Sequence, residues 1–231
     1  MSDSERLKRR IVAGVRAIPS PTRAVTRRRE ALVLGGAVAA MVIVFLFGPP
    51  CFFGQRGGVR VGPRPGALVA ATTLGSAGIA LAIVWLAIGR GRSMLGRSRA
   101  LLVAAIGAGP LLLLGWKLGC SGRYAHMMDV DPARPGLRCL VLSLSTAVAP
   151  LVAFAFTRRA GGALQPVATG AAMGVTAGAC AWIFTDLWCP LAAVPHLLLG
   201  HLLPVALMAL AGVTLGRMLA IRWRATAQLS A

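Results

Sequence analysis

The stretch ALQPVATGAAMGVTAGACAWI occupies residues 163–183 and contains no Asp, Glu, Lys or Arg. It matches the roughly 20 apolar residues that a helix needs to cross the core of a bilayer. Gly170, Gly174 and Gly178 recur in it at four-residue spacing, a pattern that lets membrane helices approach closely. The alternative is that small residues are simply frequent in membrane helices. The stretch predicts a membrane-spanning helix, with a packing face as one of two interpretations of its glycines.

Working outward, five further apolar segments have membrane length: residues 31–47, 66–89, 99–118, 137–156 and 194–216. The whole chain is 57% hydrophobic and 13% charged, whereas soluble domains are about 45–50% apolar and about 25% charged. This composition excludes a disordered chain, a fibrous protein and almost any soluble enzyme. The sequence predicts an all-α, polytopic membrane protein, a six-transmembrane-helix bundle over residues 31–220 with a short cytoplasmic N-terminal amphipathic helix.

The chain is strongly basic, with 25 Lys and Arg against 6 Asp and Glu. In a soluble protein this excess would indicate nucleic acid, but in a membrane protein it marks cytoplasmic loops. If the N-terminus is cytoplasmic, eighteen of the 25 basic residues lie on the cytoplasmic side. We therefore expect both termini, including the tail 221–231, in the cytoplasm. No DNA-reading module is recognisable, and direct binding of nucleic acid is not expected.

Residues 1–30 form the N-terminal tail. Leu7, Ile11, Val15 and Ile18 fall on one face of a helix predicted over 4–18, and a basic stretch over 23–29 would anchor the tail at the membrane. One interpretation is a helix lying on anionic lipids. The other is a recognition helix whose apolar face enters a partner's groove.

The five cysteines gather towards the non-cytoplasmic side on this topology. Cys180 lies within a helix and is expected to be a small apolar filler. Cys139 and Cys189 are candidates for a redox-responsive or metal-responsive pair, and Cys51 or Cys120 can substitute for either. No CxxC motif occurs in the chain, so the usual dithiol oxidoreductase pattern is missing.

The stretch 182–190, followed by Pro195, His196 and His201, concentrates polar and aromatic side chains round the short predicted link between the last two spans. Asp186 is costly to place near a membrane and is a functional candidate for that reason. Cys, His and Asp are also ligands of borderline-soft metals such as zinc. His196 and His201 are five residues apart, about 140° round an α-helix, so a site that uses both needs a bend. Alternatively, both histidines hydrogen-bond neighbouring helices.

Two further side chains near the outer boundary have simple structural interpretations. Trp182, like Trp188, fits an interfacial aromatic belt. Lys117 is close to an outer helix end and is expected to extend its amine towards the interface.

Several motifs together carry a family resemblance. The tail reads LKRRIVAGVRAIPSPT over residues 7–22, GLRC over 136–139 opens the fourth span, and DLWCP over 186–190 precedes HLLLGHLLP over 196–204. With six spans, these motifs resemble the negative-regulator-of-sigma-F type of integral membrane anti-sigma factor, particularly myxobacterial forms. The likeness covers nearly the whole chain.

The resemblance implies a bacterial inner-membrane protein, not an enzyme, that holds an extracytoplasmic-function sigma factor. Residues 1–30 would bind the sigma factor, and Cys139 and Cys189 would receive an oxidative or heavy-metal signal at the outer face. No cofactor is expected beyond a candidate transition-metal ion at that face. The oligomeric state cannot be read from the sequence.

Two other functions compete with this one. A membrane thiol-redox enzyme or metal carrier would use the same outer Cys, His and Asp residues. A structural membrane subunit would use none of them.

Overall fold

The computed structural model describes Glu5, Arg28, Ala31 and residues 35–43, 65–88, 98–122, 136–158, 165–189 and 191–229. All regular structure in these ranges is helical. The tail residues Leu7, Ile11, Val15 and Ile18 lie outside the described residues, as does Cys51. Residues 35–43, within the first predicted span, are helical.

Five long helices follow one another along the chain. They are α4 (Gly66–Ile88), α5 (Arg99–Gly122), α6 (Leu137–Arg158), α7 (Pro166–Trp188) and α9 (Leu203–Leu229), the last preceded by the short α8 (Val194–Leu197) and the π-helical turn η2 (Leu198–Leu202). Among the described residues, five helical stretches are long and apolar enough to cross a membrane. The all-helical architecture is thus confirmed for the described residues, with five candidate membrane spans, and the sixth span and the N-terminal helix stay predictions.

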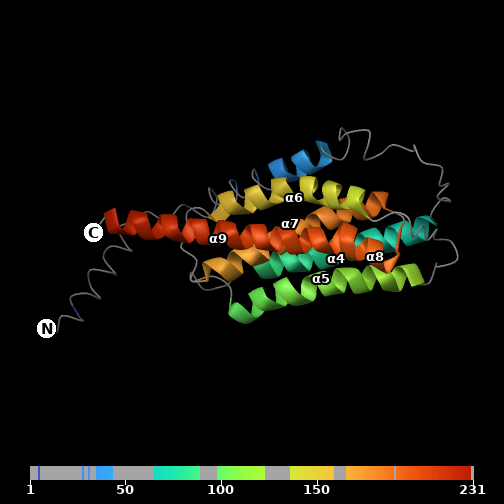
Figure 1. Cartoon of the computed structure of the whole chain (residues 1–231), viewed down its shortest axis with the longest axis horizontal. Helices are drawn as coiled ribbons and strands as arrows, with labels where there is room; N and C mark the ends of the chain where they lie inside the picture. Colours follow the sequence, from blue (N-terminus) through green and yellow to red (C-terminus); the bar gives the residue numbers. More distant parts are fainter. Residues whose placement is uncertain are drawn as a thin grey trace. The chain divides into compact units, whose positions relative to one another are not determined.

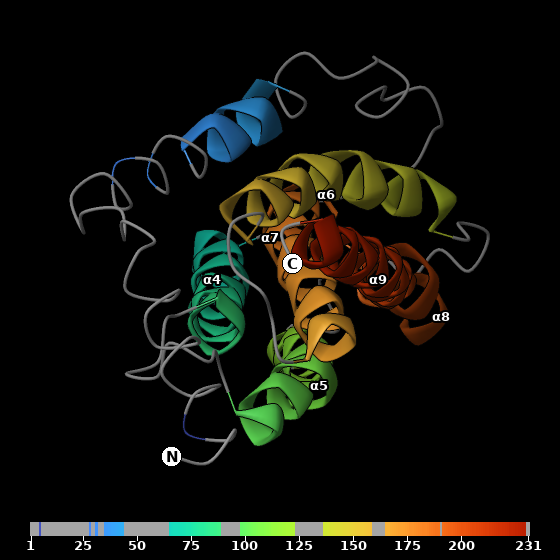
Figure 2. The same ribbon diagram turned by 90° about the vertical axis from the view of Figure 1, so that its left-hand side faces the viewer.

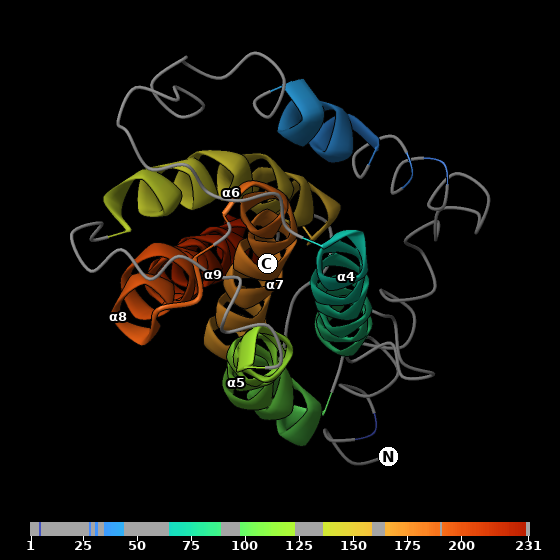
Figure 3. The same ribbon diagram turned by 90° about the vertical axis from the view of Figure 1, so that its right-hand side faces the viewer.

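Helix α7 lies at the centre of the bundle and packs against α4, α5, α6 and α9 (Figure 1). The end-on views in Figures 2 and 3 show its neighbours surrounding it. One side of α7 contributes Ala172, Val175, Ala179 and Trp182 to a core shared with α4, α5 and α9. Its other side packs Met173, Ala177 and Ala181 against α6.

Glycines bring α7 and α9 into backbone contact. A Cβ atom at Gly174 would overlap the Met208 carbonyl oxygen, and one at Gly170 would overlap the carbonyl oxygen of Gly212. A Cβ at Gly178 would lie 2.8 Å from the Val205 Cα. Gly170, Gly174 and Gly178 therefore form a packing face, because a Cβ atom at any of these three positions would meet the α9 backbone.

The structure corrects the predicted end of the fifth span. Helix α7 continues to Trp188, so Asp186 belongs to the last helical turns and not to a link. Trp182 is not part of an interfacial belt, because its side chain is only 1% exposed and belongs to the core. The reason is positional: Trp182 lies four residues after Gly178 and three after Ala179, on the side of α7 that faces other helices.

Replacing Gly174 by alanine should destabilise the bundle by about 1–3 kcal/mol, the usual cost of overpacking. The added methyl group meets a backbone atom of α9, which cannot rotate away. The matched control is Gly107→Ala in α5, where an added Cβ meets nothing within 4 Å and alanine is the better helix former. Thermal unfolding in detergent compares the two variants, and equal midpoints would contradict the packing face.

Candidate functional site

The candidate functional side chains of the described helices lie at one end of the bundle. At this end α4 begins, α5 ends, α6 begins, α7 ends and α8 lies; we call it the α8 end (Figure 1). Cys139 is in the first turn of α6, Cys189 directly follows α7, and His196 and His201 lie in α8 and η2. Residues from three separate parts of the chain thus lie together at the α8 end.

The start of α6 is held against η2 by two glycines. Gly136 has a φ of +78°, a left-handed conformation that glycine adopts without steric cost. A Cβ atom at Gly200 would lie 2.9 Å from the Cys139 Cβ and 3.0 Å from the Gly136 carbonyl oxygen. This close approach places Cys139, one helical turn after Gly136, beside the histidines.

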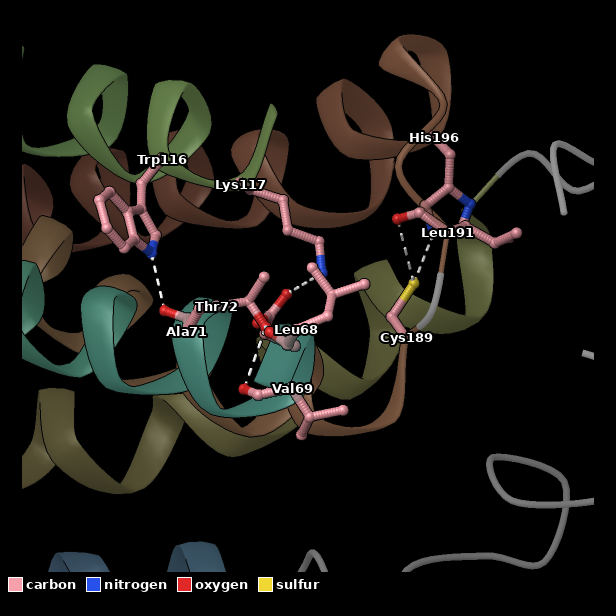
Figure 4. Close-up of polar contacts among 10 residues, drawn as sticks. Leu68, Val69, Ala71, Thr72, Trp116, Lys117, Cys189, Leu191 and His196 are labelled. Carbon is pink, nitrogen blue, oxygen red and sulfur yellow. Dashed lines mark hydrogen bonds and ion pairs between the residues drawn. The ribbon is translucent and has the colours of Figure 1, made fainter. Parts of the chain in front are cut away.

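The end of α7 positions the second cysteine. The Cys189 backbone N–H donates to the Thr185 carbonyl oxygen at 2.8 Å and closes the last turn. The Cys189 Sγ is hydrogen-bonded to His196 Nε2 at 3.0 Å and lies 3.9 Å from the Leu191 carbonyl oxygen (Figure 4). The chain turn between α7 and α8 therefore brings the thiol and the imidazole into direct contact.

The π-helical turn resolves the spacing of the two histidines. The Leu203 N–H donates to the Leu198 carbonyl oxygen, five residues back instead of four. A π-helical turn contains more residues than an α-helical one, so side chains five apart come closer to a common face. The ring centroids of His196 and His201 are 5.8 Å apart. The bend that the sequence required is this single turn.

Pro204 provides a local reason for the irregular turn. Proline has no N–H, so it cannot donate the α-helical hydrogen bond to the carbonyl oxygen four residues earlier. That oxygen belongs to Gly200 and accepts a hydrogen bond from the Ser143 hydroxyl of α6 at 3.4 Å. The Ser143 and Thr185 hydroxyl oxygens are also 2.8 Å apart. The Ser143 hydroxyl therefore joins α6 to both α7 and η2 close to the cysteines.

Four ligand-type atoms converge at the α8 end. The thiol sulfurs of Cys139 and Cys189 and one ring nitrogen each of His196 and His201 all lie within 4.8 Å of one another. We call these four residues the Cys2His2 group. Three of its members are buried and Cys139 is half-buried. The pKa of the Cys189 thiol is lowered, because hydrogen bonds from Cys139 and His196 outweigh the effect of burial, and this favours the thiolate form that binds metals.

His201 is the buried member with unmet hydrogen-bonding capacity. Its side chain is 1% exposed, and neither ring nitrogen has a hydrogen-bond partner. Its ring packs edge-on against Trp182, with centroids 5.1 Å apart. A buried polar group without a partner costs about 1–3 kcal/mol, so the fold holds this imidazole at the site at a cost in stability.

Asp186 lies outside the Cys2His2 group and forms an ion pair with Lys117 of α5 (Figure 4 shows the contact from Lys117). Their side chains are 0% and 1% exposed. The expectation that Lys117 extends towards the interface is wrong, because the carboxylate on α7 offers its ammonium a partner inside the bundle. The isolation of Asp186 in the sequence marked it as a candidate, but nothing in the sequence identified Lys117 as its partner.

Comparison with known families supplies the remaining observation. The sequence model of the family described as negative regulator of sigma F matches residues 14–223, which include all five described spans and the Cys2His2 group. The chain belongs to this family. The comparisons with curated proteins and with solved structures find no match. The family description implies a sigma factor as the partner of this membrane protein.

In this negative-regulator-of-sigma-F protein, the structure separates the four described cysteines into two sets. Cys139 and Cys189 belong to the Cys2His2 group. Cys120, in the last turns of α5, and Cys180, within α7, are free thiols outside that group. Cys120 therefore does not take the place of either member in this arrangement of the helices.

Replacing Lys117 by methionine should destabilise this anti-sigma family protein by about 3–5 kcal/mol, because Asp186 then keeps an uncompensated buried charge. The double variant Lys117→Met/Asp186→Asn removes both charges and should recover most of the loss. Unfolding midpoints in detergent measure both effects. Arg99→Met, exposed at the other end of α5, is the control. A single variant as stable as this control would contradict a buried, paired lysine.

Proposed function

We propose that this chain is an inner-membrane anti-sigma factor that sequesters an extracytoplasmic-function sigma factor through its N-terminal tail. On this proposal it is not an enzyme, and release follows a redox or metal signal received at Cys139 and Cys189. The observation that carries the proposal is the family match over residues 14–223. The convergence of both predicted sensing cysteines in one buried group supports the second part.

The distribution of arginines supports an outward-facing α8 end. The end of the bundle opposite α8 carries Arg99 at the start of α5, Arg158 at the end of α6 and Arg217 in α9. Among the described residues of the α8 end, Lys117 is paired with Asp186, which leaves Arg138. Basic residues favour the cytoplasmic side. The Cys2His2 group would then face the periplasm, where thiol oxidation persists.

The packing of α9 offers a route for the signal. The Cys2His2 group includes His201 of η2, which leads without a break into α9. Helix α9 contacts the α7 backbone from Val205, near the group, to Gly216, opposite Pro166 at the far end. Because backbone contacts cannot be absorbed by side-chain rotation, a shift of η2 would move α9 as a body. A switch further needs two arrangements of comparable free energy that the signal biases.

The position of the group favours a sensor over a metal carrier. A carrier normally places its polar ligands near the bilayer midplane, at the interface of two repeats. The Cys2His2 group lies at the ends of α6, α7 and α9, and three spans contribute to it. A ligand bound there would change how those three spans are tied together.

Sequestration by the tail is tested by affinity capture from the native host. Full-length protein should recover a sigma factor, and a variant lacking residues 2–22 should not. The double variant Ile11→Glu/Val15→Glu should weaken capture at least tenfold, because each buried apolar side chain contributes about 1.5–3 kcal/mol. Ala13→Glu, about 160° round the predicted helix from both Ile11 and Val15, is the matched control. Capture that survives loss of the tail would overturn this assignment.

The sensing role is tested with a reporter gene that the captured sigma factor transcribes. Cys139→Ser and Cys189→Ser should keep the reporter silent without stress and abolish its induction by a thiol oxidant or by cadmium. Cys180→Ser and Cys120→Ser, which alter thiols outside the group, should respond as the unmodified protein does. Normal induction in both of the first two variants would exclude a thiol sensor at this site.

A further inference from the structure

We infer that Cys139, Cys189, His196 and His201 form a complete four-ligand site for one borderline-soft divalent cation of the zinc class. The inference deepens the proposed function, because it names the ligand of the same group, and its regulatory meaning rests on that function. The site itself can be tested without any sigma factor.

The four ligand atoms lie close enough together to surround a single ion. Zinc binds sulfur at about 2.3 Å and imidazole nitrogen at about 2.0–2.1 Å, which places neighbouring ligand atoms about 3.3–3.8 Å apart. All four ligand atoms of the group lie within 4.8 Å of one another, and Cys189 Sγ and His196 Nε2 are 3.0 Å apart. Closure round an ion with these bond lengths therefore requires the ligand atoms to shift by roughly an ångström.

His201 supplies an independent observation. Its ring is 1% exposed, both nitrogens lack hydrogen-bond partners, and the ring belongs to the group. A buried imidazole is ordinarily satisfied by a neighbour, and none of the described residues provides one here. A metal ion bound to one ring nitrogen would give His201 a partner, which the surrounding helices do not provide.

The charge of the ligand set selects the class of ion. Two thiolates and two neutral imidazoles carry a total charge of −2, which a divalent cation cancels. Neutrality matters because the group is mostly buried, and an uncompensated charge in such surroundings is costly. The other buried charges nearby, Lys117 and Asp186, already cancel each other. Sulfur and imidazole together favour zinc-class ions over Mg²⁺ and Ca²⁺, which prefer oxygen ligands.

A bound ion would cross-link three elements that no disulfide joins among the described residues. Cys139 comes from α6, Cys189 from the end of α7, and the histidines from α8 and η2. Binding to the folded state alone stabilises it in proportion to the logarithm of ion concentration over dissociation constant. The ion would thus favour one arrangement of α6, α7 and α9.

The experiment is a titration of purified full-length protein in detergent with Co²⁺, a spectroscopic substitute for zinc. We expect one equivalent to bind, with the visible absorption of tetrahedral cobalt and an ultraviolet thiolate-to-cobalt band, and to be displaced by Zn²⁺. His201→Gln should weaken binding by at least about 100-fold, because it removes a ligand, whereas outer-shell substitutions cost about 10–100-fold. Cys120→Ser and Cys180→Ser, outside the group, should bind one equivalent unchanged.

Two further variants test whether weaker binding results from the lost ligand or from misfolding. His201→Cys keeps a ligand at that position and should restore binding with a stronger thiolate band. Gly200→Ala leaves all ligands in place but pushes Cys139 from η2, and it should weaken binding about tenfold, as substitutions around metal ligands do. All variants are compared as monodisperse protein by size-exclusion chromatography.

The outcomes separate the two proposals. Weak octahedral cobalt absorption alone, or equal binding by His201→Gln and the unmodified protein, would overturn the metal site. If sigma-factor capture persists in that case, the anti-sigma function stands without it. Tetrahedral binding in a protein that captures no sigma factor would support the site and overturn the proposed function.

Discussion

The backbone contact between α7 and α9 is the constraint on which the remaining structure depends. Gly170, Gly174 and Gly178 leave no side chain at three successive contact points on α7, so α9 approaches until carbonyl groups and Cα atoms touch. Lipid gives membrane helices no hydrophobic reason to associate, and close packing provides the attraction instead. Once α9 is fixed in this way, η2 and its histidines are fixed at the end of α7, and α4, α5 and α6 pack around the remaining sides of α7.

Among the described residues, the polar side-chain contacts that join different helices lie towards the α8 end. The Lys117–Asp186 pair connects α5 with α7, and Ser143 connects α6 with Thr185 of α7 and with η2. The Cys2His2 group lies at the same end. A sensor gains from this arrangement, because a chemical change at the thiols acts directly on the contacts that hold three spans together. Helix α9 connects the α8 end with the opposite end of the bundle, and it contacts the α7 backbone along the way.

The sequence predicted some features of the site and missed others. It missed those that depend on contacts with distant parts of the chain. Cys139, Cys189, His196 and His201 were predictable as a group, because span boundaries alone place them at one end. Asp186 was predictable as a functional candidate from its isolation, but its partner Lys117 is 69 residues away on another helix. The burial of Trp182 was missed because a tryptophan near the end of a span suits an interface and an interior equally well. Only helix packing separates those two environments.

The sequence by itself determined the class of fold, the positions of the five described spans and the identity of the ligand-type side chains. Those properties depend on apolar length, charge and residue type, which are local in the chain. The tertiary structure alone decided that the glycines of α7 face α9, that Lys117 is buried against Asp186, and that His196 and His201 share a site. The last depends on the π-helical turn η2, for which the missing N–H of Pro204 gives a local reason. A helical wheel drawn from the sequence assumes a regular α-helix, so it separates two rings that this one irregular turn brings together.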